Sequence, residues 1–310
     1  MNEKLLISII VPVYNSSAIM PTLLEAIEKE RITNNWNLEL LLINDGSKDD
    51  SYQQICEMAK KYSFVRGFNL SRNFGHQAAV SIGLERCRGD YIAIIDDDLQ
   101  DPPSLLPGFF KYLDEGYDVA YGVRRKRKEN FIKVACYEYF YKILRLLSEV
   151  EMPLDSGDFC VMKKRVVKSM LDLHERNPFL RGMRSWVGYK QIGVEYERGK
   201  RADGESGYTI SKLFKIASDG IFSFSNLPLR VTTFLGGIGF SAAFLYSVYI
   251  LTKKIIFGIY VEGFVTIILM ILFFGSLNLL CLGIIGEYIA RIYSQGKNRP
   301  HAIIAESTGD

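Results

Sequence analysis

The stretch Tyr91–Pro103, with the sequence YIAIIDDDLQDPP, decides the expected fold. Its first five residues are aromatic, β-branched or small and apolar, and a Gly-Asp pair precedes them, so we predict a short buried strand there. Three consecutive aspartates follow, and two consecutive prolines then prevent a smooth helical continuation. Because ligands of open α/β sheets bind at the carboxyl ends of the strands, these aspartates are candidates for a functional site.

The spacing of the three aspartates suggests a metal site. In an extended segment alternate side chains lie on the same side, so Asp96 and Asp98 would converge while Asp97 faces away. Two converging carboxylates repel each other unless a cation lies between them, and hard oxygen ligands suit Mg²⁺ or Mn²⁺. The alternative for an isolated D-x-D pattern is a solvated acidic turn that caps the following helix.

Predicted strands and helices alternate on both sides of this stretch. The further strands are expected at Leu5–Val13, Leu38–Ile43, Val65–Leu70 and Asp118–Tyr121. Alternation in units of roughly 30 residues predicts βαβ units, a mostly parallel sheet and an α/β fold. The polar residues that follow these strands are expected to meet at one edge of the sheet, and they are Asn15, Asp45, Arg72, Asp96 and Asp98.

Composition excludes several other classes of protein. The 310 residues are 48% hydrophobic with a net charge of +3, and this charge is too small to indicate nucleic-acid binding by itself. The five cysteines form no C-x-x-C pair, so neither a zinc site nor a disulfide framework is predicted. The N-terminal apolar run is broken by Pro12 and lacks a small-residue cleavage site, which predicts a strand rather than a signal peptide.

The hydrophobic excess is concentrated near the C-terminus. Leu229–Leu251 and Phe264–Ile285 are long and apolar enough to span a membrane, and the short connection between them predicts a transmembrane hairpin. Ser211–Phe224 combines lysines with large apolar residues and suits a membrane interface. The predicted organisation is a globular domain at 1–209, an amphipathic interface segment at 210–228, the hairpin at 229–288 and a C-terminal tail at 289–310.

Both ends of such a hairpin lie on one side of the membrane. The globular domain precedes it without an export signal, so we expect a multi-pass protein of the inner (plasma) membrane with this domain in the cytoplasm. Most flanking lysines and arginines agree with the positive-inside rule, although Lys253 and Lys254 oppose it. Five glycines suit close helix packing in lipid, namely Gly236, Gly237, Gly239, Gly275 and Gly283.

A dense basic run, Gly122–Lys128 with the sequence GVRRKRK, follows one of the predicted strands. It leaves the sheet at the same edge as the aspartates, so contact with an anion is an alternative to a solvated loop. The amphipathic stretch Phe131–Leu147 could belong to the core, lie on a membrane surface or mediate self-association in a homo-oligomer. Its periodicity leaves these alternatives open.

These segments, in this order, resemble the family-2 glycosyltransferases, in particular the polyprenyl-phosphate glycosyltransferases (bactoprenol glycosyltransferases and dolichol-phosphate mannose synthase). The matching segments are VPVYN at Val11–Asn15, NDGSKDDS at Asn44–Ser51, LSRNFGHQAAVSIGL at Leu70–Leu84, DDDLQDPP at Asp96–Pro103, YGVRRKRKE from Tyr121, SGDF at Ser156–Phe159 and ADGESGY at Ala202–Tyr208, together with the paired spans. The resemblance covers nearly the whole chain, so it is far more specific than a D-x-D pattern. It implies a GT-A type domain that binds a nucleotide sugar.

The resemblance also implies roles for single residues. The residues expected to bind the nucleotide are Pro12, Tyr14, Asn15, Asp45 and Asp96. The residues expected to hold Mg²⁺ or Mn²⁺, and through it the diphosphate, are Asp96, Asp98 and Gln100, whereas Asp97 is not expected to be a ligand. Asp158 falls at the position of the family's proposed catalytic aspartate and is assigned to catalysis together with Asp98, with Asp155 as the fallback.

The acceptor that the resemblance implies is a polyprenyl phosphate, such as undecaprenyl phosphate, at the membrane surface. Its phosphate has a second pKa of about 6, so at neutral pH it is largely a ready anionic nucleophile. It needs a cationic cradle more than a base, and Asp158 is therefore interpreted either as a base or as an organiser of arginines. The candidate contacts to this phosphate are Arg124, Arg125, Arg127, Arg201 and Ser206. Gly207 stands where the family commonly has a lysine, for which Lys212 is a candidate replacement.

We therefore expect metal-dependent, inverting transfer of a sugar from a nucleotide sugar, with a UDP-sugar favoured, to polyprenyl phosphate for surface glycan modification. One alternative is a membrane-bound enzyme that extends a polysaccharide or glycolipid, which is disfavoured because Q-x-x-R precedes neither Trp36 nor Trp186. The other is a non-catalytic, membrane-tethered nucleotide-binding protein. His76 is expected to be a loop residue satisfied by hydrogen bonds, and Trp186 a packing residue.

Overall fold

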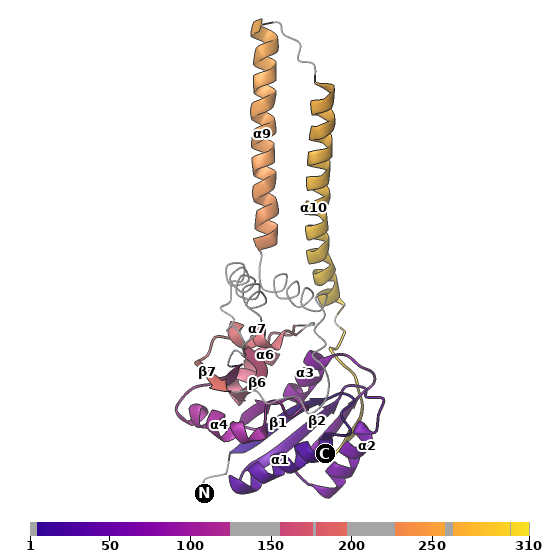
Figure 1. Ribbon diagram of the computed structural model, residues 1–310, viewed down its shortest axis with the longest axis vertical. Helices are drawn as coiled ribbons and strands as arrows, with labels where there is room; N and C mark the ends of the chain where they lie inside the picture. The colour runs from indigo at the N-terminus through magenta and orange to yellow at the C-terminus, as the bar shows by residue number, and fades with distance from the viewer. Residues whose placement is uncertain are drawn as a thin grey trace, which may run out of the picture. The chain divides into compact units, whose positions relative to one another are not determined.

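The computed structural model describes residues 5–124, 156–175, 178–196, 227–257, 263–297 and 299–309. The chain divides into two compact units, both drawn in Figure 1. The first unit contains the N-terminal α/β domain and the last residues of the chain, from Arg299 onward. The second contains the two long C-terminal helices.

A mixed sheet organises the first unit, with the strand order β7-β5-β6-β4-β1-β2-β3-β8. The strands are β1 (Leu6–Val13), β2 (Asn37–Asn44), β3 (Val65–Leu70), β4 (Tyr91–Ile94), β5 (Val119–Arg124), β6 (Ser156–Lys163), β7 (Gln191–Tyr196) and β8 (Ile304–Thr308). The β1–β2, β1–β4, β2–β3 and β5–β7 pairs are parallel, whereas β6 and β8 pair with their neighbours in the antiparallel sense. The predicted α/β fold with a mostly parallel sheet is confirmed.

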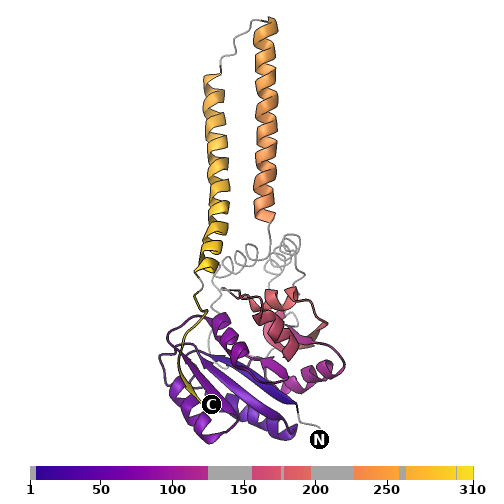
Figure 2. The same ribbon diagram turned by 180° about the vertical axis from the view of Figure 1, so that it is seen from behind.

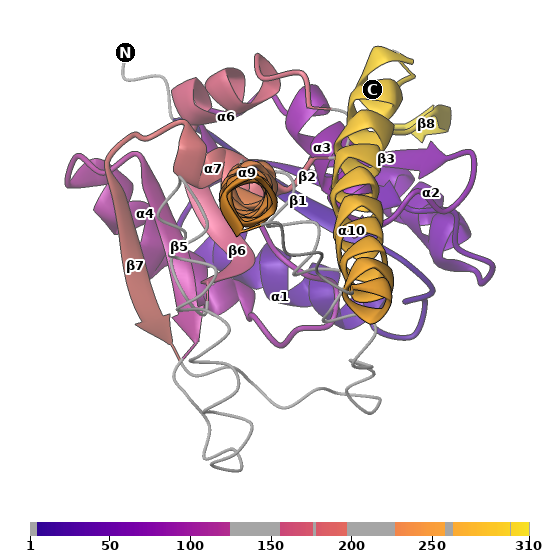
Figure 3. The same cartoon turned by 90° about the horizontal axis from the view of Figure 1, so that it is seen from above.

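Helices cover both faces of this sheet. They are α1 (Met20–Thr33), α2 (Ser51–Lys61), α3 (His76–Arg86), the 3₁₀ turn η1 (Pro103–Leu105), α4 (Leu106–Asp114), α6 (Lys164–Leu171) and α7 (Leu180–Trp186). Buried residues of α1, α2 and α4 pack on one face of the sheet, and those of α3, α6 and α7 pack on the other. Figure 3 shows α1 and α3 on opposite sides of β1 and β2. Because both faces are covered, β1 and β2 are buried along nearly their whole length and have continuous apolar sequences.

The carboxyl ends of β1, β2, β3 and β4 meet at one edge of the sheet, because these strands are parallel and in register. Two connections at this edge matter below: the β1 loop (residues 14–19) and the acidic loop (residues 95–102). Strand β6 runs antiparallel to β4, with Ile94 paired to Cys160, so β6 begins where β4 ends. This reversal brings the start of β6 to the same edge as the acidic loop.

The last strand, β8, lies at the other border of the sheet. It pairs antiparallel with β3, with Phe68 opposite Ser307, and Ala302 just before it is buried. Only a C-terminal tail was predicted for this part of the chain, without a strand. After the two long helices, the chain therefore returns to the sheet of the N-terminal domain.

The second unit consists of α9 (Leu227–Phe257) and α10 (Phe264–Gly296), which run side by side in Figures 1 and 2. Segments Val231–Lys253 and Phe273–Ala290 are long and apolar enough to cross a membrane. Of the glycines expected to allow close packing, Gly239 lies against the Phe274 ring. Within the described part of the chain, a Cβ added at any of the other four would meet no atom within 4 Å, so close packing at these glycines stays a prediction.

Candidate functional site

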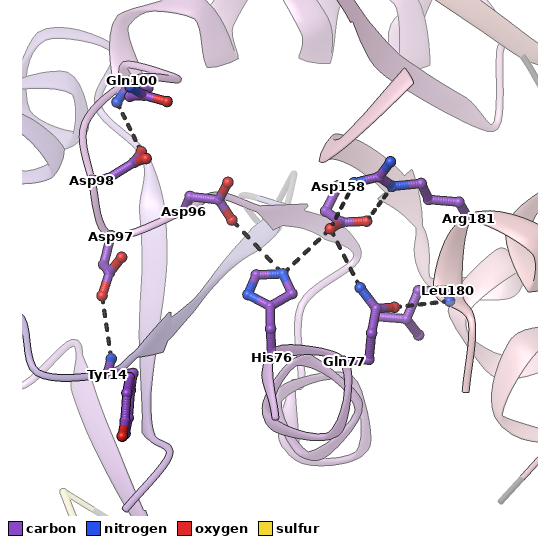
Figure 4. A network of polar contacts seen from close by, with 10 residues as sticks. All are labelled: Tyr14, His76, Gln77, Asp96, Asp97, Asp98, Gln100, Asp158, Leu180 and Arg181. Atoms are coloured by element: carbon purple, nitrogen blue, oxygen red, sulfur yellow. Dashed lines mark hydrogen bonds and ion pairs between the residues drawn. The ribbon is translucent and has the colours of Figure 1, made fainter. Parts of the chain in front are cut away.

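The acidic loop turns as soon as β4 ends. Asp97 and Asp98 lie in a turn, and Leu99 has a φ of +54°, so the extended geometry expected for the three aspartates does not extend this far. The Asp98 carboxylate accepts the backbone N–H of Gln100 at 3.0 Å, while Asp96 faces His76 (Figure 4). Alternation along an extended strand is thus the wrong reason for grouping Asp96 with Asp98.

Asp158 is the centre of the polar network in Figure 4. It lies near the start of β6, and its side chain is only 12% exposed. Arg181 of α7 donates to both carboxylate oxygens, from Nε at 2.7 Å and from NH2 at 3.1 Å. Gln77 donates from Nε2 to Oδ2 at 3.3 Å, and its Oε1 accepts the N–H of Leu180. Asp158 is therefore fixed by α3 on one side and by α7 on the other.

His76 joins Asp158 to the acidic loop. Its Nε2 lies 3.4 Å from Asp158 Oδ2 and 3.8 Å from Asp96 Oδ1. Gly75 before it has a φ of +100°, which glycine adopts without strain, and His76 is the first residue of α3. His76 therefore lies at the start of a helix rather than in a loop, and this position directs its ring toward two carboxylates. The expectation that hydrogen bonding satisfies the ring agrees with its contact with Asp158.

The pKa values of Asp158 and His76 depend on burial and on the charged groups beside them. Burial alone would raise the pKa of Asp158, but the Arg181 guanidinium and the His76 contact outweigh it and hold that pKa well below its usual range. For His76, burial lowers the pKa, but Asp158 and Asp96 outweigh this effect and the net shift is upward. Asp158 is thus an anion at neutral pH, and an anion of such low basicity is a poor general base.

The pKa of Asp96 is raised, whereas that of Asp158 is lowered. Burial, partly offset by His76, together with the like charges of Asp158, Asp101 and Asp98, raises the pKa of Asp96 to about 6. Such an accumulation of carboxylates is stabilised by a cation, and their oxygens are the ligands that Mg²⁺ and Mn²⁺ prefer. Within the described ranges, no three His, Cys, Asp or Glu side chains are arranged as a metal cluster. The donor chemistry therefore fits a divalent cation, whereas the side-chain placement is not that of a formed site.

The candidate nucleotide-binding residues lie at this same edge. Pro12 is buried near the end of β1, and Tyr14 is 47% exposed in the β1 loop. Asn15 has a φ of +51° and is fixed to the loop after β2, because its N–H donates to Ser47 Oγ at 2.9 Å. All three residues lie at or near the carboxyl end of β1, and their assignment to the nucleotide stays a prediction.

Asp45 is placed differently from the other candidates. It is 3% exposed, and its two carboxylate oxygens accept the N–H groups of Phe74 at 2.7 Å and Gly75 at 2.9 Å. Burial nevertheless outweighs these bonds and raises its pKa. In this arrangement Asp45 holds the turn that leads into α3, and its assignment to the nucleotide stays a prediction.

Most of the predicted acceptor-phosphate residues lie outside the described residues. These are Arg125, Arg127, Arg201 and Ser206, together with the fallback Asp155. Arg124 is the last residue of β5. Within the described part of the chain, the arginine that pairs with Asp158 is Arg181, which the sequence analysis did not select.

Arg181, His76 and Gln77 are the site residues that sequence reasoning missed. His76 and Gln77 stand inside the LSRNFGHQ segment, so the motif already contained them, but nothing local links them to Asp158. Arg181 belongs to the mixed arginine and aromatic segment at 177–189, whose role the sequence left open. Trp186 is 58% exposed at the end of α7, so it does not belong to the core formed by the described residues, and packing at an interface stays a prediction.

The chain is similar to known glycosyltransferases. Residues 8–171 match the family described as Glycosyl transferase family 2. The chain is 40% identical over 310 residues to "Uncharacterized glycosyltransferase YkcC" of Bacillus subtilis (strain 168), covering 100% of this chain and 96% of that protein. It is 36% identical over 302 residues to the "SfII prophage-derived bactoprenol glucosyl transferase" of Shigella flexneri, covering 97% of this chain and 98% of that protein.

Among solved structures, one similar chain is the glucosyl-3-phosphoglycerate synthase of Mycobacterium tuberculosis in complex with Mn²⁺, UDP-glucose and phosphoglyceric acid. It has a TM-score of 0.47 and 17% identity, covering 70% of this chain and 78% of that one. The family match and the observed sheet together confirm the predicted GT-A type fold.

Proposed function

The chain belongs to glycosyl transferase family 2, and from this premise we propose that it transfers a sugar from a nucleotide sugar to a polyprenyl phosphate. The single observation that carries the proposal is similarity over 97% of the chain to a protein named bactoprenol glucosyl transferase. A similarity of this extent includes the two long apolar helices as well as the α/β domain. Helices that anchor the protein in a membrane would hold the enzyme beside a lipid acceptor.

The reaction is a displacement at C1 of the sugar. An oxygen of the polyprenyl phosphate attacks C1, the bond from C1 to the diphosphate breaks, and the products are polyprenyl-phosphate-sugar and a nucleoside diphosphate. A single attack from the opposite face inverts the configuration at C1. Because the attacking phosphate is already ionised at neutral pH, the enzyme needs to position it rather than to deprotonate it.

Asp158 acts in this scheme as an organiser of cations. Its lowered pKa, its bidentate pair with Arg181 and its contact with His76 support this role over that of a base. The bidentate pair fixes the orientation of the Arg181 guanidinium, and a guanidinium of fixed orientation suits recognition of a phosphate. We add Arg181 to the arginines selected from the sequence as a candidate contact for the acceptor phosphate.

A divalent cation, Mg²⁺ or Mn²⁺, is proposed as the cofactor. Asp96, Asp98 and Gln100 would hold it. The pKa of Asp96 is raised first by burial and further by the neighbouring carboxylates, and a cation would favour its ionised form. When bound, such an ion stabilises the charge that grows on the leaving nucleoside diphosphate. Tyr14 and Asn15 are the proposed contacts for the nucleotide, for which UDP is favoured.

The membrane arrangement is proposed as two spans with the α/β domain in the cytoplasm. The return of the chain to the sheet as β8 supports an even number of spans, because β8 and β3 have to lie on the same side of the membrane. The sugar-lipid product would then serve surface glycan modification.

The test is transfer by full-length protein carrying Asp98→Ala, with Asp114→Ala as the matched control. Asp114 accepts a hydrogen bond from Tyr91 at the far end of β4, away from the acidic loop. We expect metal-dependent transfer to fall by about 100-fold or more in Asp98→Ala and to stay at the wild-type level in the control. Full metal-dependent activity in Asp98→Ala would contradict the proposed mechanism.

A further inference from the structure

Asp97, the middle residue of the acidic run, has no role in the mechanism above. Its carboxylate oxygen Oδ2 accepts the hydroxyl of Ser16 at 2.5 Å and the backbone N–H of Tyr14 at 3.3 Å. Both donors belong to the β1 loop, and Figure 4 shows the contact with Tyr14. Asp97 therefore ties the β1 loop to the acidic loop across the functional edge of the sheet.

The β1 loop is also held from its other side. The N–H of Asn15 donates to Ser47 Oγ at 2.9 Å, and the Asn15 side chain accepts the N–H of Lys48 at 2.8 Å. The φ of Asn15 is +51°, a conformation that asparagine tolerates better than most residues. The loop after β2 thus fixes one side of the β1 loop, and Asp97 fixes the other.

The hydrogen bonds from Ser16 and Tyr14 to Asp97 lie outside the apolar core of the fold. Tyr14 is 47% exposed, and neither Ser16 nor Asp97 is buried in the apolar clusters on the two faces of the sheet. Loops that are only partly buried lose conformational entropy when a ligand orders them. A bond from a hydroxyl to a carboxylate is charge-assisted and is stronger than a neutral hydrogen bond, so it can order the loops beforehand.

We propose that Asp97 is a positioning residue for the donor, which holds the β1 loop at a fixed distance from the acidic loop. This inference rests on the proposed function, because a nucleotide diphosphate would have to contact both loops at once. The nucleoside end would meet Tyr14 and Asn15, and the diphosphate end would meet Asp96 and Asp98. A fixed separation between the loops then lowers the cost of binding the donor without any direct contact to it.

The experiment measures UDP binding to full-length protein by calorimetry, with and without Mn²⁺. We expect Asp97→Ala to raise the Kd of UDP by about tenfold in both conditions, because the lost bonds involve a charged acceptor. Asp97→Asn keeps an acceptor oxygen, so its rise in Kd should be smaller. The KM for the donor should rise with the Kd, while the KM for the acceptor should stay at the wild-type value.

Ser16→Ala removes the hydroxyl that Asp97 accepts and serves as the second arm of the test. We expect it to raise the Kd of UDP in the same direction, and we expect the double variant Ser16→Ala/Asp97→Ala to bind little more weakly than Asp97→Ala alone. Such non-additivity is the signature of one shared interaction. Asp114→Ala, which removes a comparable acceptor from Tyr91, should leave the Kd unchanged.

The outcomes separate this inference from the proposed function. Wild-type protein that binds UDP, together with folded Asp97→Ala protein of unchanged Kd, would overturn the inference alone. If Asp97→Ala does not fold, an unchanged Kd in Ser16→Ala would overturn it equally. Wild-type protein that binds no nucleotide from a panel of nucleoside diphosphates would overturn the proposed function, and the inference with it.

Discussion

At the scale of single residues, the site is a row of alternating charges. Asp96, His76, Asp158 and Arg181 follow one another at contact distances between 2.7 and 3.8 Å. Each charge has a neighbour of opposite sign, which explains how two carboxylates lie close together in a half-buried place. Removal of one member should therefore change the protonation of the next.

Arg181→Ala should move the pH dependence of transfer. In the wild type the pKa of Asp158 is below its unfolded value, so the paired carboxylate stabilises the fold above a pH of about 4, and this stabilisation is lost only as the pH falls through the lower, folded pKa. No acid limb from Asp158 is thus expected between about pH 5 and 8. Without Arg181, only the His76 contact offsets burial, so we expect the pKa of Asp158 to rise and the acid limb of the pH–rate profile to move to higher pH.

Arg165→Ala is the control for this prediction. Arg165 pairs with the buried Asp118, as Arg181 pairs with Asp158, but it lies at the start of α6 and away from the acidic loop. Its loss should lower Tm without changing the shape of the pH–rate profile. Identical profiles for wild type and Arg181→Ala would refute the role given to the pair.

At the scale of elements, the packing of α2, β3 and β8 gives a prediction about stability. A Cβ added at Gly67 of β3 would press on the buried Ile55 of α2 and on Thr308 of β8. We expect Gly67→Ala to lower the free energy of unfolding by about 1–3 kcal/mol through overpacking. Gly108→Ala, in α4 with open space around it, should instead raise it by up to about 1 kcal/mol because alanine favours the helix.

Chemical denaturation of the two variants measures this difference. Equal effects of Gly67→Ala and Gly108→Ala would mean that α2 and β8 do not pack on Gly67 of β3 as described. Both substitutions add the same methyl group, but Gly67 lies in a tightly packed strand and Gly108 in a helix with open space around it.

The sequence predicts those elements whose signal is local. Strands β1, β2 and β4 are mostly apolar because helices cover both faces of the sheet, and such stretches are easily recognised. Strand β3, VRGFNL, carries a weaker signal of this kind. Strand β8, IAEST, has no such run, because it lies at the border of the sheet and joins β3 mainly through backbone bonds. The pairing of Asp158 with His76 and Arg181 depends on the reversal of β6 and the placement of α7, and no local pattern contains this information.

At the scale of the whole molecule, the chain order makes a prediction about topology. The N-terminal domain and β8 share one sheet, while α9 and α10 stand between them in sequence. If both helices span the membrane, tags placed before residue 5 and after residue 309 should both be accessible only from the cytoplasmic side, and a cysteine in the 258–262 connection only from the other side. Labelling of intact cells and inverted vesicles with an impermeant thiol reagent and a protease checks this, and opposite locations of the two tags would rule it out.

The measurement that tests the central claim most directly is a transfer assay on purified full-length protein. Undecaprenyl phosphate, Mg²⁺ or Mn²⁺ and a panel of nucleotide sugars are supplied, and lipid-linked product is detected by mass spectrometry, with a chelator as control. We predict a chelator-sensitive polyprenyl-phosphate-sugar from one donor, together with release of the nucleoside diphosphate. Intact nucleotide sugar and no lipid product with every donor would contradict the account.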